Sequence, residues 1–170
     1  MTHLYIVRHG IAALPGTPGI PDDERLLTSK GEKRVRQIAR GLAKLELKLD
    51  RIVTSPLPRA RATAEIIADE LNSRKLLEIS NVLQTGSSAA TVKRWLRERT
   101  EDRLMIVGHN PTLSDLASLL VLGSTQPTIC DLKKGGIAAL TRAAADAELY
   151  EVHWIAPPRL IRGLMDGNNH

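Results

Sequence analysis

The sequence has few aromatic side chains and only one cysteine. Its 170 residues include two Trp, two Tyr and no Phe. Proteins that bind single-stranded nucleic acid stack bases on aromatic side chains, so this shortage makes nucleic acid a minor alternative as a partner. A lone cysteine, Cys130, cannot form an internal disulfide or a cysteine-rich metal site. We expect Cys130 to be an inert core residue.

Long hydrophobic runs are also missing. No segment approaches the roughly 18 uninterrupted apolar residues that span a bilayer. The N-terminus shows no basic region followed by an apolar stretch and a cleavage site. We therefore expect a cytoplasmic protein with no membrane partner. The length favours one domain over residues 1–170, and the net charge of +5 favours an anionic partner: nucleic acid, a phosphorylated small molecule or an acidic protein.

Short apolar segments alternate with helical patterns along most of the chain. The segments that predict strands are 4–7, 51–55, 75–80, 103–108, 136–141 and 148–155. The patterns that predict helices lie at about 29–47, 57–72, 88–100 and 112–122. This order predicts an α/β three-layer sandwich with a largely parallel central sheet flanked by helices. Such sheets bind ligands at the carboxyl ends of their strands.

Three of the predicted strands end in residues suited to chemistry. The first ends in Arg8, His9 and Gly10, and we expect the glycine to let the backbone turn without a steric penalty. Another ends in His109, and a third runs into a helix whose first turn carries Arg59. These side chains share one crevice if the three strands are neighbours. The loop at 12–25, which is rich in proline and glycine, would form a rim of that crevice.

Two arginines and two histidines without a matching set of acids predict an anion site. Arginine suits phosphate because its planar fork makes paired, charge-assisted hydrogen bonds. A neutral imidazole is a competent nucleophile toward phosphorus, which is a role for His9. Fixed cations around the transferred group supply catalysis without a metal, a role for Arg8, Arg59 and His109. The sequence contains no Gly-rich phosphate loop and no dinucleotide fingerprint, so no nucleotide cofactor is predicted.

The motifs together resemble a known family, the histidine phosphatase superfamily with its phosphoglycerate mutase-like fold. The resemblance covers nearly the whole chain. The short length and two segments, RHGIA and KKGGIAAL, look most like the SixA-type phosphohistidine phosphatases. The motifs that carry the family resemblance are RHG (8–10), LLTSKG (26–31), SPLPRARATA (55–64) and VGHNPTL (107–113).

The resemblance implies a phosphatase that works through a covalent phosphohistidine. His9 would be the phosphorylated nucleophile, while Arg8, Arg59 and His109 bind the transferred phosphoryl group. Gly10 is counted with these phosphate-binding residues. The mechanism implied by the family needs no cofactor and no metal.

The sequence departs from the family pattern at two positions. Ala62 stands where many members have glutamine, and Asn81 stands about where many carry a glutamate that acts as general acid. Glu78 or one of the three acids at 22–24 remains open as a replacement. An alkoxide leaving group needs a proton in the transition state far more than an imidazole does. The missing acid therefore favours phosphohistidine, and the short segment 71–101 leaves the site open to a phosphorylated side chain of a protein.

Several alternatives stay open. A phosphatase of a small phosphorylated metabolite would share the fold, and a non-catalytic phosphate-binding or interaction module is less favoured. Ser55 and Ser114 lie in no nucleophile-elbow pattern, which disfavours a serine hydrolase. The basic segments 30–48 and 93–103 are most simply solvated helix faces, with a docking role open for either. The oligomeric state is not predicted.

Overall fold

The computed structural model describes residues 2–142 and 147–165. The two ends of the predicted domain, Met1 and His170, lie outside the described residues. Among the described residues, no helix is long and apolar enough to cross a membrane.

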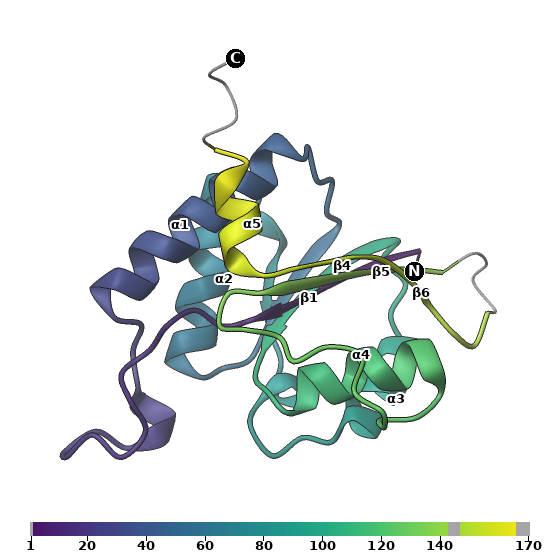
Figure 1. Ribbon diagram of the computed structural model, residues 1–170, viewed down its shortest axis with the longest axis horizontal. Coiled ribbons are helices and arrows are strands. Elements are labelled where there is room, and N and C mark those ends of the chain that lie inside the picture. The colour runs from purple at the N-terminus through teal and green to yellow at the C-terminus, as the bar shows by residue number, and fades with distance from the viewer. Residues whose placement is uncertain (1, 143–146, 166–170) are drawn as a thin grey trace.

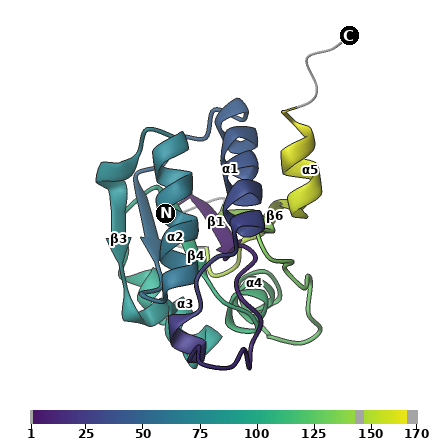
Figure 2. The same cartoon turned by 90° about the vertical axis from the view of Figure 1, so that its left-hand side faces the viewer.

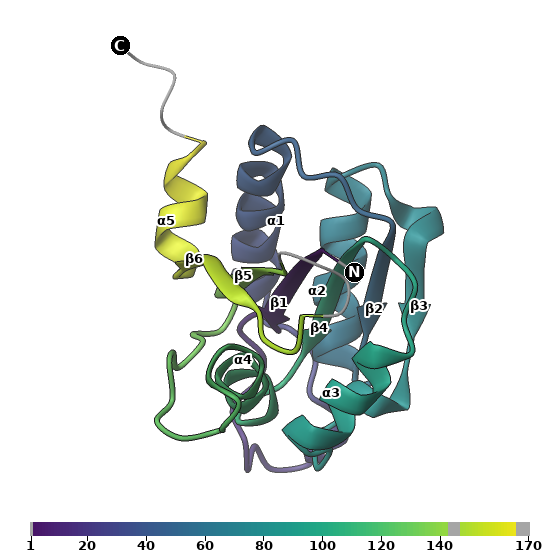
Figure 3. The ribbon, with the colours of Figure 1, turned by 90° about the vertical axis from the view of Figure 1, so that its right-hand side faces the viewer.

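Six strands form one sheet in the order β3-β2-β4-β1-β5-β6. Figure 3 shows this order across the sheet, from β6 at one edge to β3 at the other. Strands β1 to β4 are parallel to one another, whereas β5 and β6 run antiparallel. The prediction of a largely parallel sheet therefore holds for four of the strands. The strands are β1 (His3–Arg8), β2 (Arg51–Thr54), β3 (Leu77–Ile79), β4 (Arg103–Gly108), β5 (Ile137–Thr141) and β6 (Glu151–Ala156).

Helices cover both faces of the sheet, which gives the three layers that the sequence predicts (Figure 1). One face carries α1 (Ser29–Lys44), α2 (Pro58–Glu70) and α5 (Pro158–Gly163), and the other carries α3 (Ala89–Arg97) and α4 (Thr112–Leu122) (Figure 2). Side chains of a strand alternate between the two cores: Leu4 and Ile6 join the α3/α4 core, and Val7 joins the α1/α2 core. Both faces of the central strands are thus buried, as their continuous apolar runs predict.

Local signals in the sequence set the helix ends. The Thr28 hydroxyl accepts a hydrogen bond from the amide of Gly31 and caps α1, and Ser88 caps α3 in the same way. Pro58 begins α2, where its missing amide hydrogen costs no helical bond. Helix α4 ends at Gly123, whose φ of 74° suits glycine.

The predicted elements differ from the observed ones mainly at their ends. Strand β3 is shorter than predicted because Arg74–Leu76 forms a 3-10 turn, and β6 begins at Glu151. Helix α5 was not predicted, since six residues give too little periodicity to recognise. It packs closely on α1 because Gly41 has no side chain: a Cβ there would lie 2.1 Å from the Ile161 carbonyl oxygen.

The strand register brings the three predicted strand ends together. Arg8 pairs with Gly108 across β1 and β4, and Thr54 pairs with Val107 across β2 and β4. The residues that follow β1, β2 and β4 therefore emerge side by side at the carboxyl edge of the sheet. The adjacency on which the predicted crevice depends is confirmed.

Candidate active site

His9 lies at the carboxyl ends of the strands, and one of its ring nitrogens has no hydrogen-bond partner among residues 2–142 and 147–165. Its amide donates to the Gly108 carbonyl oxygen (3.0 Å), which fixes the backbone beside β4. Its Nδ1 lies 2.7 Å from the Gly10 carbonyl oxygen. Because a carbonyl oxygen only accepts, Nδ1 carries the hydrogen and Nε2 keeps its lone pair.

The imidazole of His9 is neutral at physiological pH. Burial lowers its pKa to about 3, since a charged ring would lose its hydration; the Gly10 hydrogen bond opposes this shift, and the nearby His109, Arg59 and Arg8 add to it. Only 5% of the residue is exposed. A neutral imidazole with a free Nε2 is the form that attacks an electrophile.

His109 faces His9, with ring centroids 5.1 Å apart. Its Nε2 lies 2.8 Å from the Ser55 hydroxyl oxygen, which also accepts from the Leu57 amide (3.3 Å). The serine therefore has its hydrogen available for Nε2, which would leave the hydrogen of His109 on Nδ1. Nδ1 is buried without a partner among the described residues, so it is available as a donor to a bound anion. Burial, which has the largest effect, and the charge of Arg59, which has the next largest, lower the pKa of His109 to about 4.

Arg8 is positioned by contacts with residues 131–135, the segment that precedes β5. Its Nη1 donates to the Leu132 carbonyl oxygen (2.6 Å) and lies 3.9 Å from the Asp131 carboxylate. The amide of Gly135 donates to the carbonyl oxygens of Arg8 and His9. Burial lowers the pKa of Arg8, with Asp131 opposing the shift. The Nε of Arg8 has no partner among the described residues, so the guanidinium has a donor to spare.

Arg59 comes from the first turn of α2 and is 2% exposed. Its Nη1 donates to the Asp22 backbone carbonyl (2.6 Å), and its Nη2 donates to the Asp22 carboxylate (3.2 Å). Arg25 holds the same carboxylate from the other side, with Nε and Nη2 each 2.8 Å from Oδ1. Arg25 is 6% exposed, and its charge lowers the pKa of His109. Three guanidinium groups thus surround two neutral imidazoles.

Gly10 is required for a different reason from the one expected. Its φ is not among the positive values of the chain. A Cβ at Gly10 would lie 2.5 Å from Cγ2 of Val35, so close approach of β1 to α1 excludes a side chain. The Gly10 amide donates to the Thr63 hydroxyl (3.0 Å), which in turn donates to the Arg59 carbonyl oxygen (2.7 Å). Gly10 therefore links the end of β1, which carries His9, to the helix that carries Arg59.

None of the residues considered as general acid is placed as a proton donor at the two histidines. Glu78 is held by both terminal nitrogens of Arg99 (3.0 Å each). Asn81 is exposed on a 3-10 turn, as are Asp23 and Glu24 on another. Asp22 reaches the site as a carboxylate. Burial raises its pKa, but the hydrogen bond and charge of Arg25 together with Arg59 outweigh burial and lower it. An ionised Asp22 cannot donate a proton.

The site is less open than the sequence suggested. The segment 71–101 holds only short turns, β3 and α3, as expected, and adds no lid. However, Asp22 on the loop at 12–25 contacts Arg59, and both histidines are buried. The loop, which was predicted as a rim, contributes Asp22 to the site.

Three contributors were not assigned by sequence reasoning: Arg25, Ser55 as partner of His109, and the Leu132 carbonyl. Arg25 lies in an irregular loop, where no periodicity marks a buried position. Ser55 was considered only as a possible nucleophile. Its position directly after β2, beside the strand that leads to His109, could have indicated that it contacts this histidine. Cys130 is half-buried against the α3/α4 core, where burial raises the pKa of its thiol.

Comparison with known proteins identifies the family. A family model described as the histidine phosphatase superfamily (branch 1) matches residues 4–84. An uncharacterised protein of Picosynechococcus sp. is 36% identical over 170 residues, which covers 91% of this chain and 99% of that protein. Together with the SixA similarities given below, the family-model match shows that the chain belongs to the histidine phosphatase superfamily. Its six-stranded sheet between helical layers is the phosphoglycerate mutase-like fold of these histidine phosphatases.

Two further comparisons point to one group within the histidine phosphatases. The phosphohistidine phosphatase SixA of Escherichia coli K12 is 29% identical over 127 residues, which covers 73% of this chain and 77% of that protein. A solved structure of the protein histidine phosphatase SixA with tungstate is 26% identical, with a TM-score of 0.81, and the match covers 94% of this chain and 99% of that one. These similarities support a phosphatase activity.

Proposed function

We propose that the protein is a phosphohistidine phosphatase that removes phosphate from histidine on a protein substrate through an intermediate on His9. The observation that carries the proposal is the unprotonated Nε2 of the buried His9, which has no partner among the described residues, none of whose carboxylic acids is placed to protonate a leaving group. The similarity to proteins named SixA supports the substrate class.

In the first step, the Nε2 lone pair of His9 attacks phosphorus. A nitrogen–phosphorus bond forms on His9 as the nitrogen–phosphorus bond of the substrate breaks, and the imidazole of the substrate leaves with the electron pair. The Gly10 carbonyl aligns this attack, because it fixes the ring through Nδ1. It also stabilises the positive charge that develops on the ring as Nε2 bonds to phosphorus.

Arg8, Arg59 and His109 bind the three non-bridging oxygens during transfer. Charge in phosphoryl transfer spreads over these oxygens, so fixed donors around them lower the barrier. Within the part of the chain that the structure describes, Arg8 Nε and the buried His109 Nδ1 have no partner. Arg59 becomes available when a phosphoryl oxygen replaces the Asp22 carboxylate. Arg25 retains that carboxylate at the edge of the site.

In the second step, a water oxygen attacks the phosphorus on His9. The bond to Nε2 breaks, its electron pair returns to the ring, inorganic phosphate leaves and the water proton passes to solvent or phosphate. His9 is restored as a neutral imidazole. Neither step requires a group beyond the residues described, and cofactor-free, metal-independent turnover remains a prediction, as does a cytoplasmic location.

The nature of the leaving group decides the substrate class. An imidazole leaves as a neutral molecule when its second nitrogen carries a proton, which solvent supplies. An alkoxide has no such route and depends on a general acid in the site. Asp22 is ionised, and Glu78 is bound to Arg99. The described residues therefore favour a phosphoramidate over an alkyl phosphoester.

The test compares phosphate release from a phosphohistidine-bearing protein and from an alkyl phosphoester, without added metal. We expect a higher kcat/KM for phosphohistidine. His9→Ala should abolish release, whereas His153→Ala should not, because His153 is exposed on β6. During turnover, radiolabelled phosphate should be trapped on His9 in a linkage that is stable to alkali and labile to acid.

Each rival has its own signature in this experiment. A higher kcat/KM for the phosphoester would identify a metabolite phosphatase with a proton donor in the site. Binding of the phosphoprotein with no release of phosphate would identify a non-catalytic interaction module. Full activity in His9→Ala would refute the covalent mechanism.

A further inference from the structure

The loop between β1 and α1 carries apolar side chains on its outer surface. It projects beyond the sheet and the helices at the lower left of Figure 1. Residues 12–21 include no charged side chain, although 25% of the chain is charged. Leu14 is 72% exposed, Leu26 is 64% exposed and Ile20 is 39% exposed. Exposed apolar side chains that gather in one segment, rather than being scattered, indicate an interaction surface.

Two successive turns shape this loop. Residues 14–17 and residues 17–20 each have proline in the second position and glycine in the third. The two glycines have φ values of 76° and 77°. In each turn the amide of the fourth residue donates to the carbonyl oxygen of the first (3.3 and 3.1 Å). This is the pattern of a type II turn. Because the turns already restrict the backbone, a partner that binds the loop has less conformational entropy to overcome.

Ile20 and Leu26 line the same open groove, which we call the loop groove. Its volume is about 520 Å³. The lining comes from residues 13–29, all of which the structure describes, and Glu24 is the only charged residue in that lining. A partner that covers the loop groove removes apolar surface from water, and it gains most from this if its own contacting side chains are apolar.

A buried arginine joins the loop groove to the candidate active site. Nη1 of Arg25 donates to the carbonyl oxygen of Ala13, a lining residue of the groove (2.7 Å). Nε and Nη2 of the same guanidinium hold Asp22, whose carboxylate lies 3.2 Å from Arg59. Ala13 also follows His9 by only four residues, so their Cα atoms are at most about 14 Å apart. The groove and the phosphate site are therefore continuous.

We propose that the loop groove docks the protein substrate through apolar side chains that flank its phosphohistidine. The inference rests on the proposed function, in which a histidine of another protein must reach His9. Residues beside that histidine then lie over the loop, because Arg25 connects the groove directly to the site. The centres of protein interfaces are depleted in charged residues, as is the segment 12–21. The occupant is thus a protein surface that is apolar around its phosphohistidine.

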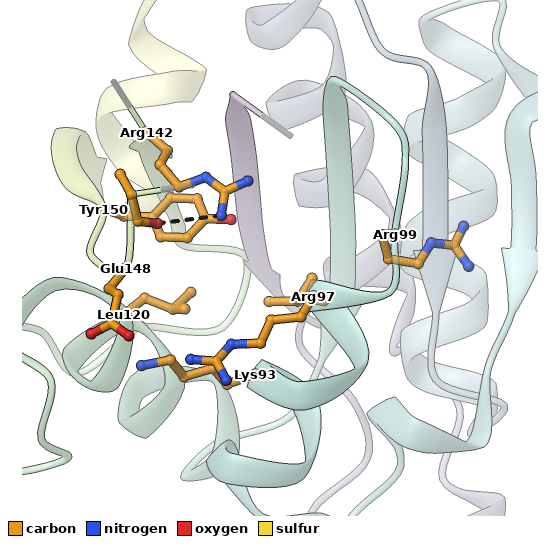
Figure 4. A pocket seen from close by; sticks show the side chains of 9 residues that line it. Lys93, Arg97, Arg99, Leu120, Arg142, Glu148 and Tyr150 are labelled. Carbon is orange, nitrogen blue, oxygen red and sulfur yellow. Dashed lines mark hydrogen bonds between the residues drawn. The ribbon is translucent and has the colours of Figure 1, made fainter. Parts of the chain in front are cut away.

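A basic face on α3 is the rival docking surface. Lys93 and Arg97 point to the same side of α3 and line a pocket together with Arg142 (Figure 4). Such a face would attract an acidic region of a substrate. Arg142 follows β5 at the amino end of β1, however, whereas His9 follows the carboxyl end. A strand of this length separates them by about 20 Å, so the loop groove begins nearer to His9.

Phosphohistidine peptides of equal length test the proposal. The phosphohistidine is flanked by leucines in one peptide, by serines in the second and by aspartates in the third, and free phosphohistidine gives the rate without flanking residues. We expect kcat/KM to be at least about fivefold higher for the leucine peptide than for the serine peptide, through KM, because docking adds binding away from the reacting group. Equal values for these two peptides would overturn the proposal. A preference for the aspartate peptide would also overturn it and favour the basic face of α3.

A matched pair of variants locates the preference. Ile20→Ser/Leu26→Ser removes two apolar side chains from the loop groove. Leu45→Ser/Leu122→Ser removes two that are 42% and 46% exposed at the far ends of α1 and α4. The groove variant should lose the preference for the leucine peptide and the control should keep it, while both hydrolyse free phosphohistidine like the wild type. If the double groove variant does not fold, Leu26→Ser, at the more exposed position, replaces it. A preference that survives in the groove variant, or that both variants lose equally, would overturn the proposal.

These measurements distinguish failure of the docking proposal from failure of the proposed function. If neither the peptides nor free phosphohistidine are hydrolysed faster than an alkyl phosphoester, the proposed function is wrong and the docking proposal falls with it. If phosphohistidine is hydrolysed but the leucine and serine peptides do not differ, only the docking proposal is wrong. Sedimentation tests a second copy of the chain as the occupant: a dimer that the groove variant loses and the control keeps would assign the loop groove to self-association and overturn the proposal.

Discussion

The carboxylate of Asp22 lies 3.2 Å from Nη2 of Arg59, and the Asp22 carbonyl accepts from Nη1 of the same guanidinium. Two donors of a buried arginine in the candidate phosphate site are therefore taken by the chain itself. Arg25 donates a hydrogen bond to Oδ1 of this carboxylate. Burial raises the pKa of Asp22, but the hydrogen bond and charge of Arg25 lower it by more, so the carboxylate stays ionised. In the proposed reaction, a phosphoryl oxygen and the Asp22 carboxylate compete for Arg59.

Replacement of the aspartate should tighten phosphate binding. Asp22→Asn removes the charge that competes with phosphate for Arg59. Because the Asp22 side chain is 59% exposed, the Asp22–Arg59 ion pair is worth only about 1 kcal/mol of interaction free energy. Loss of this interaction should lower the inhibition constant of inorganic phosphate about three- to tenfold. Product inhibition of turnover measures this. Asp23→Asn, at the exposed neighbouring position, is the control; an inhibition constant that moves equally in both variants would contradict the competition.

Ser55 should control the tautomer of His109. Its hydroxyl lies 2.8 Å from Nε2, and without it a buried nitrogen loses its hydrogen-bond partner. If His109 binds the phosphoryl group as proposed, Ser55→Ala should lower kcat/KM about tenfold, within the range that one lost hydrogen bond predicts. Ser55→Thr keeps a hydroxyl and should restore most of the rate. Nitrogen NMR of His109 should show the Nδ1–H form in the wild type and a mixture in Ser55→Ala. An unchanged tautomer would remove this role from Ser55.

The meeting of the candidate site residues could be predicted from sequence because it depends on which strand ends are neighbours. Apolar runs that stop at Arg8–His9 and before His109 require only that β1 and β4 be parallel neighbours for the side chains to meet, and the structure has them so. Four helices were predicted for a similar reason: each is long enough to show its period.

The remaining features depend on contacts that periodicity does not encode. Strands β5 and β6 run antiparallel to their neighbours, but their composition resembles that of the parallel strands. The sequence therefore does not reveal their direction. Arg25 is buried in an irregular loop because Asp22 and the Ala13 carbonyl accept its hydrogen bonds. The basic face of α3 was interpreted as solvated, since Arg142 is far away in the sequence and only the fold brings it to the same pocket.

Stability should fall as the pH falls below 6.5. The pKa values of His9 and His109 are lowered by burial to about 3 and about 4 in the folded protein. Between these values and the ordinary histidine pKa of about 6.5, the unfolded chain binds more protons than the folded one. The free energy of unfolding therefore decreases with decreasing pH, by about 2 kcal/mol for each histidine at pH 5.

Urea unfolding from pH 7.5 to 5 measures this dependence. His9→Gln should flatten the slope by removing one of the two titrating groups. His153→Gln, at an exposed position on β6, is the matched control. A slope that is the same in the wild type and in His9→Gln would mean that His9 is not held neutral by burial.

Gly10→Ala should destabilise the fold through one contact. The added Cβ would lie 2.5 Å from Cγ2 of Val35, closer than packed atoms approach, so the Val35 side chain or the backbone at Gly10 must shift. Overpacking of this kind costs roughly 1–3 kcal/mol. Gly163→Ala is the matched control, since a Cβ there meets nothing within 4 Å. Its free energy of unfolding should stay within about 0.5 kcal/mol of the wild type, the usual range for a surface substitution.

A second substitution identifies the contact responsible. If Val35 is the obstacle, Val35→Ala makes room for the new methyl group, and Gly10→Ala/Val35→Ala should lose less stability than the sum of the two single variants. Strict additivity would place the obstacle elsewhere. Activity adds an independent readout, because the Gly10 carbonyl orients His9 through Nδ1. A shift of the Gly10 backbone should therefore lower kcat in Gly10→Ala. Because the same shift would cause the loss of stability and the loss of kcat, Gly10→Ala/Val35→Ala should recover part of each.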